Sequence, residues 1–399
     1  MYKRQVQALH SAGLGVVMDV VYNHTYYSYS WLERTVPGYW NRRWENGSLT
    51  NGSGCGCDLA SERTMVRKYL VDSCVYWAKE YHIDGFRFDL MALHDVETMN
   101  AIRAALDALP GGEDILMYGE PWQGGSTRME HGAIPANKQA AGLLDSRIGF
   151  FCDNTRDAIK GGVFNAGSAG YINGDMHCGY QVLHSIPAWR GGQADFMPQA
   201  PGQVVQYVSA HDNYTLWDKL KCVARRGDYA APDADLLAQN RMAAGIYLTC
   251  QGLPFMQGGE EFARTKHGDH NTYRGPLELN RLDWTRAAQL EELVQYYHGL
   301  LEIRKAYPEL SGMAGDAEPC ILSLPGWLIG FVPERRDESL PGRLAVYYNP
   351  ERTRQWAALP AGSWRYLCDG TRAAAEPFGP ACRNAIELAP VSVTILKVE

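Results

Sequence analysis

The chain has 399 residues, of which 46% are hydrophobic and 21% charged, a composition typical of a globular protein with more than one domain. Its net charge of −7 and its isoelectric point near 5.9 argue against nucleic acid as the main partner, because phosphate binding needs a basic surface. No run of about 18 apolar residues occurs, so we expect no membrane-spanning helix.

The cysteines do not indicate a disulfide-stabilised protein. Ten cysteines in a chain of this length are too sparse for the disulfide framework of small secreted domains. Cys55 and Cys57 form the only close pair, but they lack the two-residue gap of common zinc sites, so we expect no bound metal. A location in the reducing cytoplasm fits this cysteine content best. Four other cysteines lie in apolar stretches, where cysteine usually behaves as a small buried hydrophobe: Cys74, Cys152, Cys222 and Cys250.

The start of the sequence looks artificial. Residues 1–5 read Met-Tyr-Lys-Arg-Gln, similar to the translated end of a sequencing-library adapter, and helical sequence follows them directly. We therefore expect the natural N-terminus to lie further upstream, together with any targeting signal. Secretion is not excluded for that reason.

From residue 6 onward, short apolar strands alternate with amphipathic helices. The run 16–21 is apolar with one acid, the pattern of a strand that is buried on both faces. Six strand-helix units predict a parallel sheet under helices, either an open doubly wound sheet or a (β/α)8 barrel. We expect strands at 16–21, 83–90, 115–118, 148–152, 204–208 and 254–257, and helices at 6–12, 61–81, 96–109, 234–250 and 290–306.

Beyond residue 306 the pattern changes to short strands. In the last of them apolar residues alternate with Ser392 and Thr394, which is typical of a half-buried antiparallel strand. We therefore expect a partial barrel over 6–306 and an all-β sandwich domain over 307–399. The strands of this second domain are expected at 327–332, 344–348, 364–368 and 391–398.

Four acidic residues stand at or just beyond the ends of predicted strands: Asp19, Asp89, Glu120 and Asp212. Carboxylates at the carboxyl ends of barrel strands suit glycoside hydrolysis, in which one acid protonates the leaving oxygen and another faces the oxocarbenium-like carbon. One such acid is weak support, because capping of the following helix explains it about as well. Four of them favour a catalytic site.

Two of these acids have neighbours that suit different roles in catalysis. The period of two puts Arg87 and Asp89 on one face of their strand, where the arginine keeps the carboxylate ionised, as a nucleophile requires. A structural ion pair is the alternative. Glu120 precedes Pro121 and Trp122, and such apolar surroundings raise the pKa of a glutamic acid so that it can act as the general acid.

Histidines accompany two of the predicted strand ends. His24 follows Asn23 at one end, and His211 precedes Asp212 and Asn213 at another. A lone histidine is more often a structural group than a catalyst. Two histidines in matching positions indicate hydrogen bonds to sugar hydroxyl groups.

The segments 19–24, 85–89, 119–122 and 211–213 resemble, in order, the four signature regions of the α-amylase superfamily of glycoside hydrolases. The resemblance implies a (β/α)8 TIM barrel and a retaining mechanism through a covalent glycosyl-aspartate. It implies Asp89 as nucleophile, Glu120 as general acid/base and Asp212 as transition-state stabiliser. The substrate-binding residues are then expected to be Asp19, Asn23, His24, Arg87, Trp122, His211 and Asn213.

Within the superfamily, the segments 51–63, 89–100, 118–122 and 207–213 resemble type I pullulanases. Amylases that cut α-1,4 links usually carry a Lys-His pair shortly after the nucleophile, where this chain has Leu93-His94. The implied substrates contain α-1,6 branch links, as in pullulan, amylopectin, glycogen or limit dextrins. No cofactor is implied. Calcium sites occur in the superfamily, but no acidic loop of this sequence indicates one.

The chain also departs from that family. The signature YNWGYDP, the first two barrel strands and the usual N-terminal carbohydrate-binding modules are absent, and Cys57 stands where the family has Asn. We therefore expect an incomplete barrel with two open sheet edges. The chain alone is then predicted to be poorly soluble, with little or no activity.

Three alternatives stay open. An isoamylase-type or glycogen-debranching enzyme would handle the short links of pullulan badly. A metal-dependent amidohydrolase would need a His-x-His pair after a strand, and this sequence has none. Two insertions, 26–60 and 154–203, follow strands on the side where barrel enzymes build their sites. Aromatic residues in such loops would also suit a protein that binds α-glucan without turnover.

Overall fold

The computed structural model describes residues 1–130, 132–193, 195–313, 318–333 and 344–399. The chain forms two compact units. Unit 1 contains Met1–Phe151 and Arg190–Val205, and unit 2 contains Cys152–Trp189 and Gln206–Glu399.

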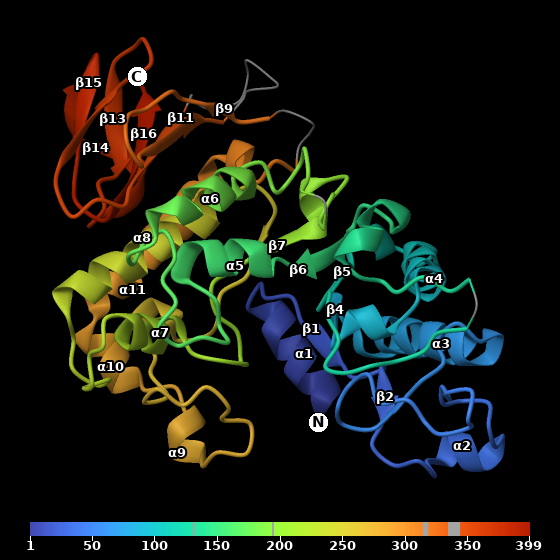
Figure 1. Cartoon of the computed structure of the whole chain (residues 1–399). Helices are drawn as coiled ribbons and strands as arrows, with labels where there is room; N and C mark the ends of the chain where they lie inside the picture. Colours follow the sequence, from blue (N-terminus) through green and yellow to red (C-terminus); the bar gives the residue numbers. More distant parts are fainter. Residues whose placement is uncertain (131, 194, 314–317, 334–343) are drawn as a thin grey trace. The chain divides into compact units, whose positions relative to one another are not determined.

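Unit 1 is built on a parallel sheet with helices beside it (Figure 1). Its strands are β1 (Val17–Val20), β4 (Gly85–Phe88), β5 (Leu116–Gly119), β6 (Ile148–Phe151) and β7 (Val204–Gln206), and its other elements are α1 (Tyr2–Ser11), β2 (His24–Thr25), α2 (Trp31–Thr35), β3 (Cys57–Asp58), α3 (Thr64–Tyr81) and α4 (Val96–Asp107). The strand order is β1-β4-β5-β6-β7. Asp19 of β1 pairs with Arg87 of β4, which pairs with Tyr118 of β5. Because these strands are parallel, their carboxyl ends lie at the same edge of the sheet.

The helices of unit 1 follow from the spacing of apolar residues and from end caps. In α3, Val66, Leu70, Cys74 and Ala78 recur every fourth residue, and all four are buried. Asp95 caps α4, because its side chain accepts a hydrogen bond from an amide of the first turn. Figure 1 shows α3 and α4 packed side by side.

The first strand of the sheet differs from the prediction. The pattern of 16–21 predicted burial on both faces, but Val17 is 38% exposed and Val21, just beyond β1, is 54% exposed. Among the described strands β1 pairs only with β4 in this sheet. The prediction was wrong because β1 is an edge strand, and one of its edges has no neighbour in the part of the chain that the structure describes.

Unit 2 combines helices with a β domain. Its helical part contains α5 (Asp153–Lys160), α6 (Gly179–Ser185), α7 (Leu216–Val223), α8 (Ala234–Thr249), β8 (Leu253–Pro254), α9 (Leu277–Asn280), α10 (Trp284–Gln289) and α11 (Glu291–Ala306). The carbonyl of Gln206, the last residue of β7, accepts a hydrogen bond at 2.9 Å from the amide of Phe255, which follows β8. Helices α8 and α11 lie side by side (Figure 1), and Tyr247, Tyr296 and Tyr297 fill the core around them.

The C-terminal part of unit 2 is the predicted antiparallel β domain. Its strands are β9 (Cys320–Ile321), β10 (Ile329–Val332), β11 (Leu344–Asn349), β12 (Gln355–Ala358), β13 (Trp364–Cys368), β14 (Ala373–Cys382), β15 (Ala385–Leu388) and β16 (Ser392–Val398). One sheet has the order β14-β13-β16-β11-β10-β9, and β12 pairs with β15 in a second sheet. Tyr347, Trp364 and Leu396 belong to the core cluster that joins strands of both sheets.

The alternating pattern of the last strand was misleading. Ser392 and Thr394 are only 3% and 2% exposed, so β16 is not half-buried. It lies centrally, between β11 and β13. Val393 packs into the core that includes α8, while Leu396 belongs to the core cluster of the two sheets.

The short helices α5, α6 and α7 were not predicted from the sequence. Each has eight residues or fewer. A helix this short does not fill the window of about 11–18 residues in which the helical period can be recognised.

In the described part of the chain, no helix combines the length and the apolar character needed to cross a bilayer.

Candidate active site

Arg87 is the centre of a cluster of predicted site residues in unit 1. Its Nη1 donates to Asp19 Oδ1 at 2.8 Å and to Asp89 Oδ1 at 2.9 Å, and its Nη2 donates to Glu120. The guanidinium is 8% exposed, the Asp89 carboxylate 26% and the Glu120 carboxylate 7%. Three acids therefore share one buried cation. The prediction that Arg87 and Asp89 lie on one face of their strand is confirmed.

The position of this cluster follows from the sheet. Asp19 and Arg87 are paired residues of β1 and β4, Asp89 follows β4, and Glu120 follows β5. Burial lowers the pKa of Arg87, but the charge of Glu120 and the hydrogen bond to Asp19 outweigh it and hold that pKa above the ordinary value. Arg87 therefore stays charged while it holds the three acids.

Asn23 fixes the Asp89 carboxylate from a second direction. The fully buried Asn23 amide donates from Nδ2 to Asp89 Oδ2 at 2.9 Å and to the Asp89 carbonyl at 2.8 Å. Its Oδ1 accepts from His24 Nδ1 at 2.5 Å. The amide thus orients both the carboxylate and the imidazole, and leaves His24 Nε2 as the ring nitrogen that can accept a hydrogen bond.

The surroundings of Glu120 are more polar than predicted. The Leu90 amide donates to Glu120 Oε2 at 2.8 Å, in addition to the contact from Arg87. Leu90 has φ +40°, a left-handed conformation that is uncommon for a branched side chain. The carboxylate therefore has two hydrogen-bond donors, although Glu120 is only 5% exposed. Trp122, two residues further on, is half-buried.

The remaining predicted residues belong to unit 2. His211 and Asp212 have exposed side chains, and His211 Nε2 lies 3.7 Å from Asp212 Oδ1. Asn213 has φ +62°, a left-handed conformation that asparagine tolerates better than most residues. Unit 1 therefore brings together six of the predicted residues in one hydrogen-bonded network, and unit 2 holds three consecutive ones. The six are Asp19, Asn23, His24, Arg87, Asp89 and Glu120.

Some residues of the site could not be found by sequence reasoning. The Leu90 amide contacts Glu120 only because of its left-handed backbone, for which no glycine gives a signal. Lys266 donates to the His211 carbonyl and Glu260 accepts from the Ser209 hydroxyl, and both residues are only 3% exposed. Their signal was weak, because charged residues after a strand are usually on a solvated surface.

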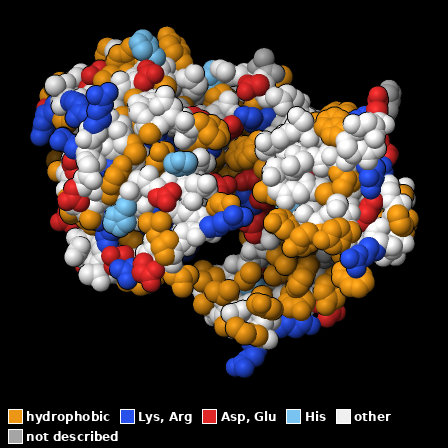
Figure 2. Space-filling view, turned by 60° about the horizontal axis from the view of Figure 1, so that its bottom comes forward, with side chains coloured by type: hydrophobic (Ala, Val, Ile, Leu, Met, Phe, Trp, Pro, Cys, Tyr) orange, Lys and Arg blue, Asp and Glu red, His pale blue; other side chains and the backbone are white. Residues whose placement is uncertain are grey.

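An exposed group of aromatic side chains follows His24. Tyr26, Tyr27, Tyr29 and Trp31 are between 58% and 82% exposed, and Tyr27 and Tyr29 stack with their centroids 5.8 Å apart. Figure 2 brings forward the end of the molecule where β2 and α2 lie and shows apolar side chains at the surface there. Exposed rings of this kind suit contact with the apolar faces of sugars.

In the described residues, no three His, Cys, Asp or Glu side chains come together in a way that could hold a metal ion. Gly52 lies in a compact turn, and its backbone amide donates to Asp58 Oδ1 at 2.9 Å and to Asp58 Oδ2 at 2.8 Å. The glycine-rich segment around it is therefore organised by its own carboxylate.

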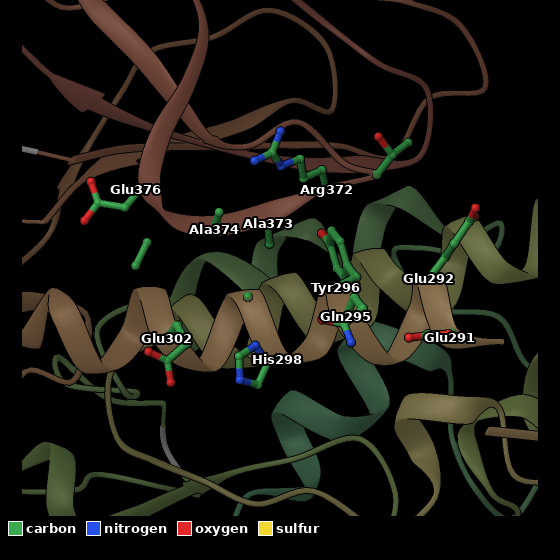
Figure 3. Close-up of a pocket in the computed structure, with 13 residues that line it drawn as sticks. Glu291, Glu292, Gln295, Tyr296, His298, Glu302, Arg372, Ala373, Ala374 and Glu376 are labelled. Atoms are coloured by element: carbon green, nitrogen blue, oxygen red, sulfur yellow. The ribbon is translucent and has the colours of Figure 1, made fainter. Parts of the chain in front are cut away.

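Unit 2 also has a groove that is lined by none of the predicted site residues. This groove, between α11 and β14, has a volume of about 850 Å³. Figure 3 shows Arg372 and Glu376 on one side of it and His298 and Glu302 on the other. Its aromatic residue, Tyr296, is only 1% exposed. The groove therefore offers no aromatic surface to a sugar. The candidate site remains the cluster of acids at the strand ends around Arg87.

The chain is similar to known proteins in sequence and structure. No protein-family model matches it. It is 40% identical over 317 residues to a pullulanase of Bacillus subtilis (strain 168), an alignment that covers 77% of this chain and 42% of that relative. The solved structure of a pullulanase from Bacillus acidopullulyticus is 34% identical with a TM-score of 0.90, over 99% of this chain and 48% of that one.

A second solved structure is similar to the same degree. The type I pullulanase from Bacillus subtilis str. 168, complexed with maltose, is 34% identical with a TM-score of 0.89, over 99% of this chain and 55% of that one. The chain thus spans about half the length of these relatives. Together with the strand-end acids around Arg87, these similarities show that the chain belongs to the type I pullulanase family of the α-amylase superfamily.

Proposed function

We propose that the protein hydrolyses α-1,6-glucosidic branch links of α-glucans with retention of the anomeric configuration. The observation that carries this proposal is the pair of carboxylates, Asp89 and Glu120, held on the two Nη atoms of Arg87. Retaining glycosidases need two carboxyl groups about 5–5.5 Å apart, and the span of one guanidinium suits that separation better than the ~6.5–9.5 Å of inverting enzymes.

The proposed reaction has two steps. An Asp89 carboxylate oxygen attacks the anomeric carbon, the bond to the leaving oxygen breaks, and the proton of Glu120 goes to that oxygen. Water then attacks the anomeric carbon, Glu120 takes one of its protons, and the bond to Asp89 breaks. Asp212 stabilises the developing positive charge in both steps.

The other predicted residues are proposed to hold the sugar at the cleavage point. Arg87 and Asn23 orient the Asp89 carboxylate, which their hydrogen bonds to it support. His24 offers its free Nε2 to a sugar hydroxyl. Asp19, Trp122, His211 and Asn213 complete the proposed substrate-binding set.

The proposed substrates are pullulan, amylopectin, glycogen and limit dextrins. Support comes from the family and from the related type I pullulanase that was crystallised with maltose. The exposed aromatic rings from Tyr26 to Trp31 favour contact with a glucan chain. Nucleic acid and membranes are not proposed as partners, because the chain is acidic overall.

We further propose that the parallel sheet is part of a (β/α)8 barrel whose first two strands lie outside this chain. The exposure of Val17 and Val21 beside β1 supports an edge that further strands would cover. The proposed domains are a catalytic barrel over 6–306 and a β-sandwich over 307–399, with residues 1–5 derived from an adapter. A reducing cytoplasm is the proposed location and rests on the cysteine content alone.

The test is the release of reducing sugar from pullulan by this chain joined to the upstream part of a type I pullulanase. Asp89→Asn and Glu120→Gln are each expected to abolish maltotriose release. Asp84→Asn is the matched control, because Asp84 stands at the amino end of the same strand, where its side chain accepts from the Val16 amide at 2.6 Å. Cleavage of α-1,4-linked amylose without any pullulan turnover would overturn the proposed bond specificity.

A further inference from the structure

Asp212 lies in a loop whose backbone is held by a buried lysine. Lys266, in the segment after β8, donates from Nζ to the His211 carbonyl at 3.1 Å and to Thr272 Oγ1 at 2.7 Å. Lys266 is only 3% exposed. A buried ammonium group is energetically unfavourable unless it is hydrogen-bonded, so these contacts constrain the position of the His211 carbonyl strongly.

Lys266 is itself fixed in place. Its backbone amide donates to Asp218 Oδ2 at 2.7 Å, and the hydroxyl of Thr265 donates to Asp218 Oδ1 at 2.5 Å. Asp218 is in α7, the helix that begins just after the Asp212 loop. The lysine therefore joins the start of α7, the loop before it and the segment after β8.

A second buried group holds the same loop two residues earlier. Glu260 accepts a hydrogen bond from Ser209 Oγ and another from the Tyr247 hydroxyl at 2.9 Å. It is 3% exposed, and burial raises its pKa to about 7. Ser209 and His211 flank Ala210, so the segment after β8 anchors the chain at two points directly before Asp212.

The side chain of Asp212 is exposed. Its Oδ1 lies 3.7 Å from His211 Nε2, its carboxyl group is 66% exposed, and the charge of Lys266 also acts on it. The direction of this carboxylate is therefore set mainly by the backbone that carries it, and Asn213 continues that backbone with φ +62°.

We propose that Lys266, supported by Glu260, is a positioning residue that fixes the backbone of His211 and so aims the Asp212 carboxylate at the reacting sugar. This inference rests on the proposed function of Asp212 as transition-state stabiliser. Errors of about 1 Å in the placement of such a group cost about 10²-fold in rate.

The experiment compares Lys266→Met with a second buried lysine of the same unit. Lys219 is fully buried and donates from Nζ to the carbonyls of Gly162 and Asn165 at 2.9 and 2.7 Å, so Lys219→Met removes an equally buried anchor from another loop. Both variants are made in the pullulan-hydrolysing polypeptide, and kcat, KM and the thermal midpoint are measured. Lys266→Met is expected to lower kcat about 10²-fold with KM changed less than about threefold. Lys219→Met is expected to lower the thermal midpoint similarly and to keep kcat.

A conservative variant covers the case in which Lys266→Met does not fold. Lys266→Gln keeps an N–H donor. If the contact to the His211 carbonyl is what matters, kcat of Lys266→Gln should be at least about tenfold higher than kcat of Lys266→Met. The inference is overturned if Lys266→Met keeps kcat, or if Lys219→Met loses as much kcat as Lys266→Met does.

Asp212→Asn separates the inference from the proposed function. If Asp212→Asn loses turnover and Lys266→Met keeps it, the positioning role fails while the proposed function stands. If Asp212→Asn itself keeps turnover, the role proposed for Asp212 fails, and the positioning role fails with it.

Discussion

Arg87 shows how one residue can assemble the candidate site of unit 1. It contacts the carboxylates of Asp19, Asp89 and Glu120 at once. A guanidinium has five N–H donors in a fixed plane, so it can bridge carboxylates that come from three different strands. A lysine ammonium is a compact point charge on a flexible stem and cannot hold three acids in the same geometry.

We therefore expect Arg87→Lys to lower kcat on pullulan at least about 10²-fold although the charge is kept. Arg147→Lys is the matched control, because Arg147 also bridges two acids of unit 1, Asp107 and Asp145, at 2.7 and 3.0 Å. That pair lies at the surface and its replacement should leave kcat within about twofold. Equal activity of Arg87→Lys and the unchanged protein, measured by release of reducing sugar, would contradict a bridging role.

The residues of this site were predictable to different degrees. The strand period alone placed Arg87 beside Asp89, because neighbours two apart in a strand share a face. The contact between Arg87 and Glu120 depends on the register of β4 against β5, which no local pattern encodes. The left-handed backbone of Leu90 left no trace in the sequence either.

At the scale of elements, sequence patterns located the long helices and the buried strands but not the neighbours of each strand. The pattern of β16 predicted one solvent-exposed face, whereas the central position of β16 between β11 and β13 buries Ser392 and Thr394. The pattern of β1 predicted two buried faces, whereas Val17 is exposed at an edge. In both cases the local pattern is compatible with either environment, and only the tertiary neighbours decide.

The packing of α11 against β14 gives a prediction at this scale. A Cβ added at Gly299 of α11 would stand 2.0 Å from the backbone carbonyl of Ala373 in β14. Replacing glycine by alanine inside a helix usually adds about 1 kcal/mol of stability. Here we expect the opposite sign, a loss of about 2 kcal/mol, because the strand has to move away.

The measurement is the urea midpoint of unfolding of Gly299→Ala. Gly227→Ala is the control, because a Cβ there meets nothing within 4 Å and the residue is not in a left-handed conformation. A midpoint for Gly299→Ala equal to or above that of the unchanged protein would show that α11 and β14 do not approach each other so closely.

At the scale of the whole molecule, the parallel sheet has an edge at which an apolar side chain is exposed. Val17 of β1 is 38% exposed, and β1 pairs only with β4 among the described strands of this sheet. Exposed strand edges with apolar side chains promote association between chains. The chain also spans about half the length of the pullulanases it matches. Under the proposed barrel, further strands would lie beside β1 in the active protein.

This argument predicts opposite effects of one substitution in two polypeptides. In the chain alone, Val21→Lys places a charge at a position that is 54% exposed beside the open edge, and we expect a larger soluble fraction after expression. In the chain joined to the upstream part of a type I pullulanase, the same lysine would be buried under the added strands, and we expect a lower thermal midpoint and weaker pullulan turnover. Val36→Lys, at a position 47% exposed on the same unit but outside the sheet, should change neither polypeptide much. If Val21→Lys behaves alike in both polypeptides, or if the chain alone is a soluble monomer that hydrolyses pullulan, the edge of β1 is not where further strands are added.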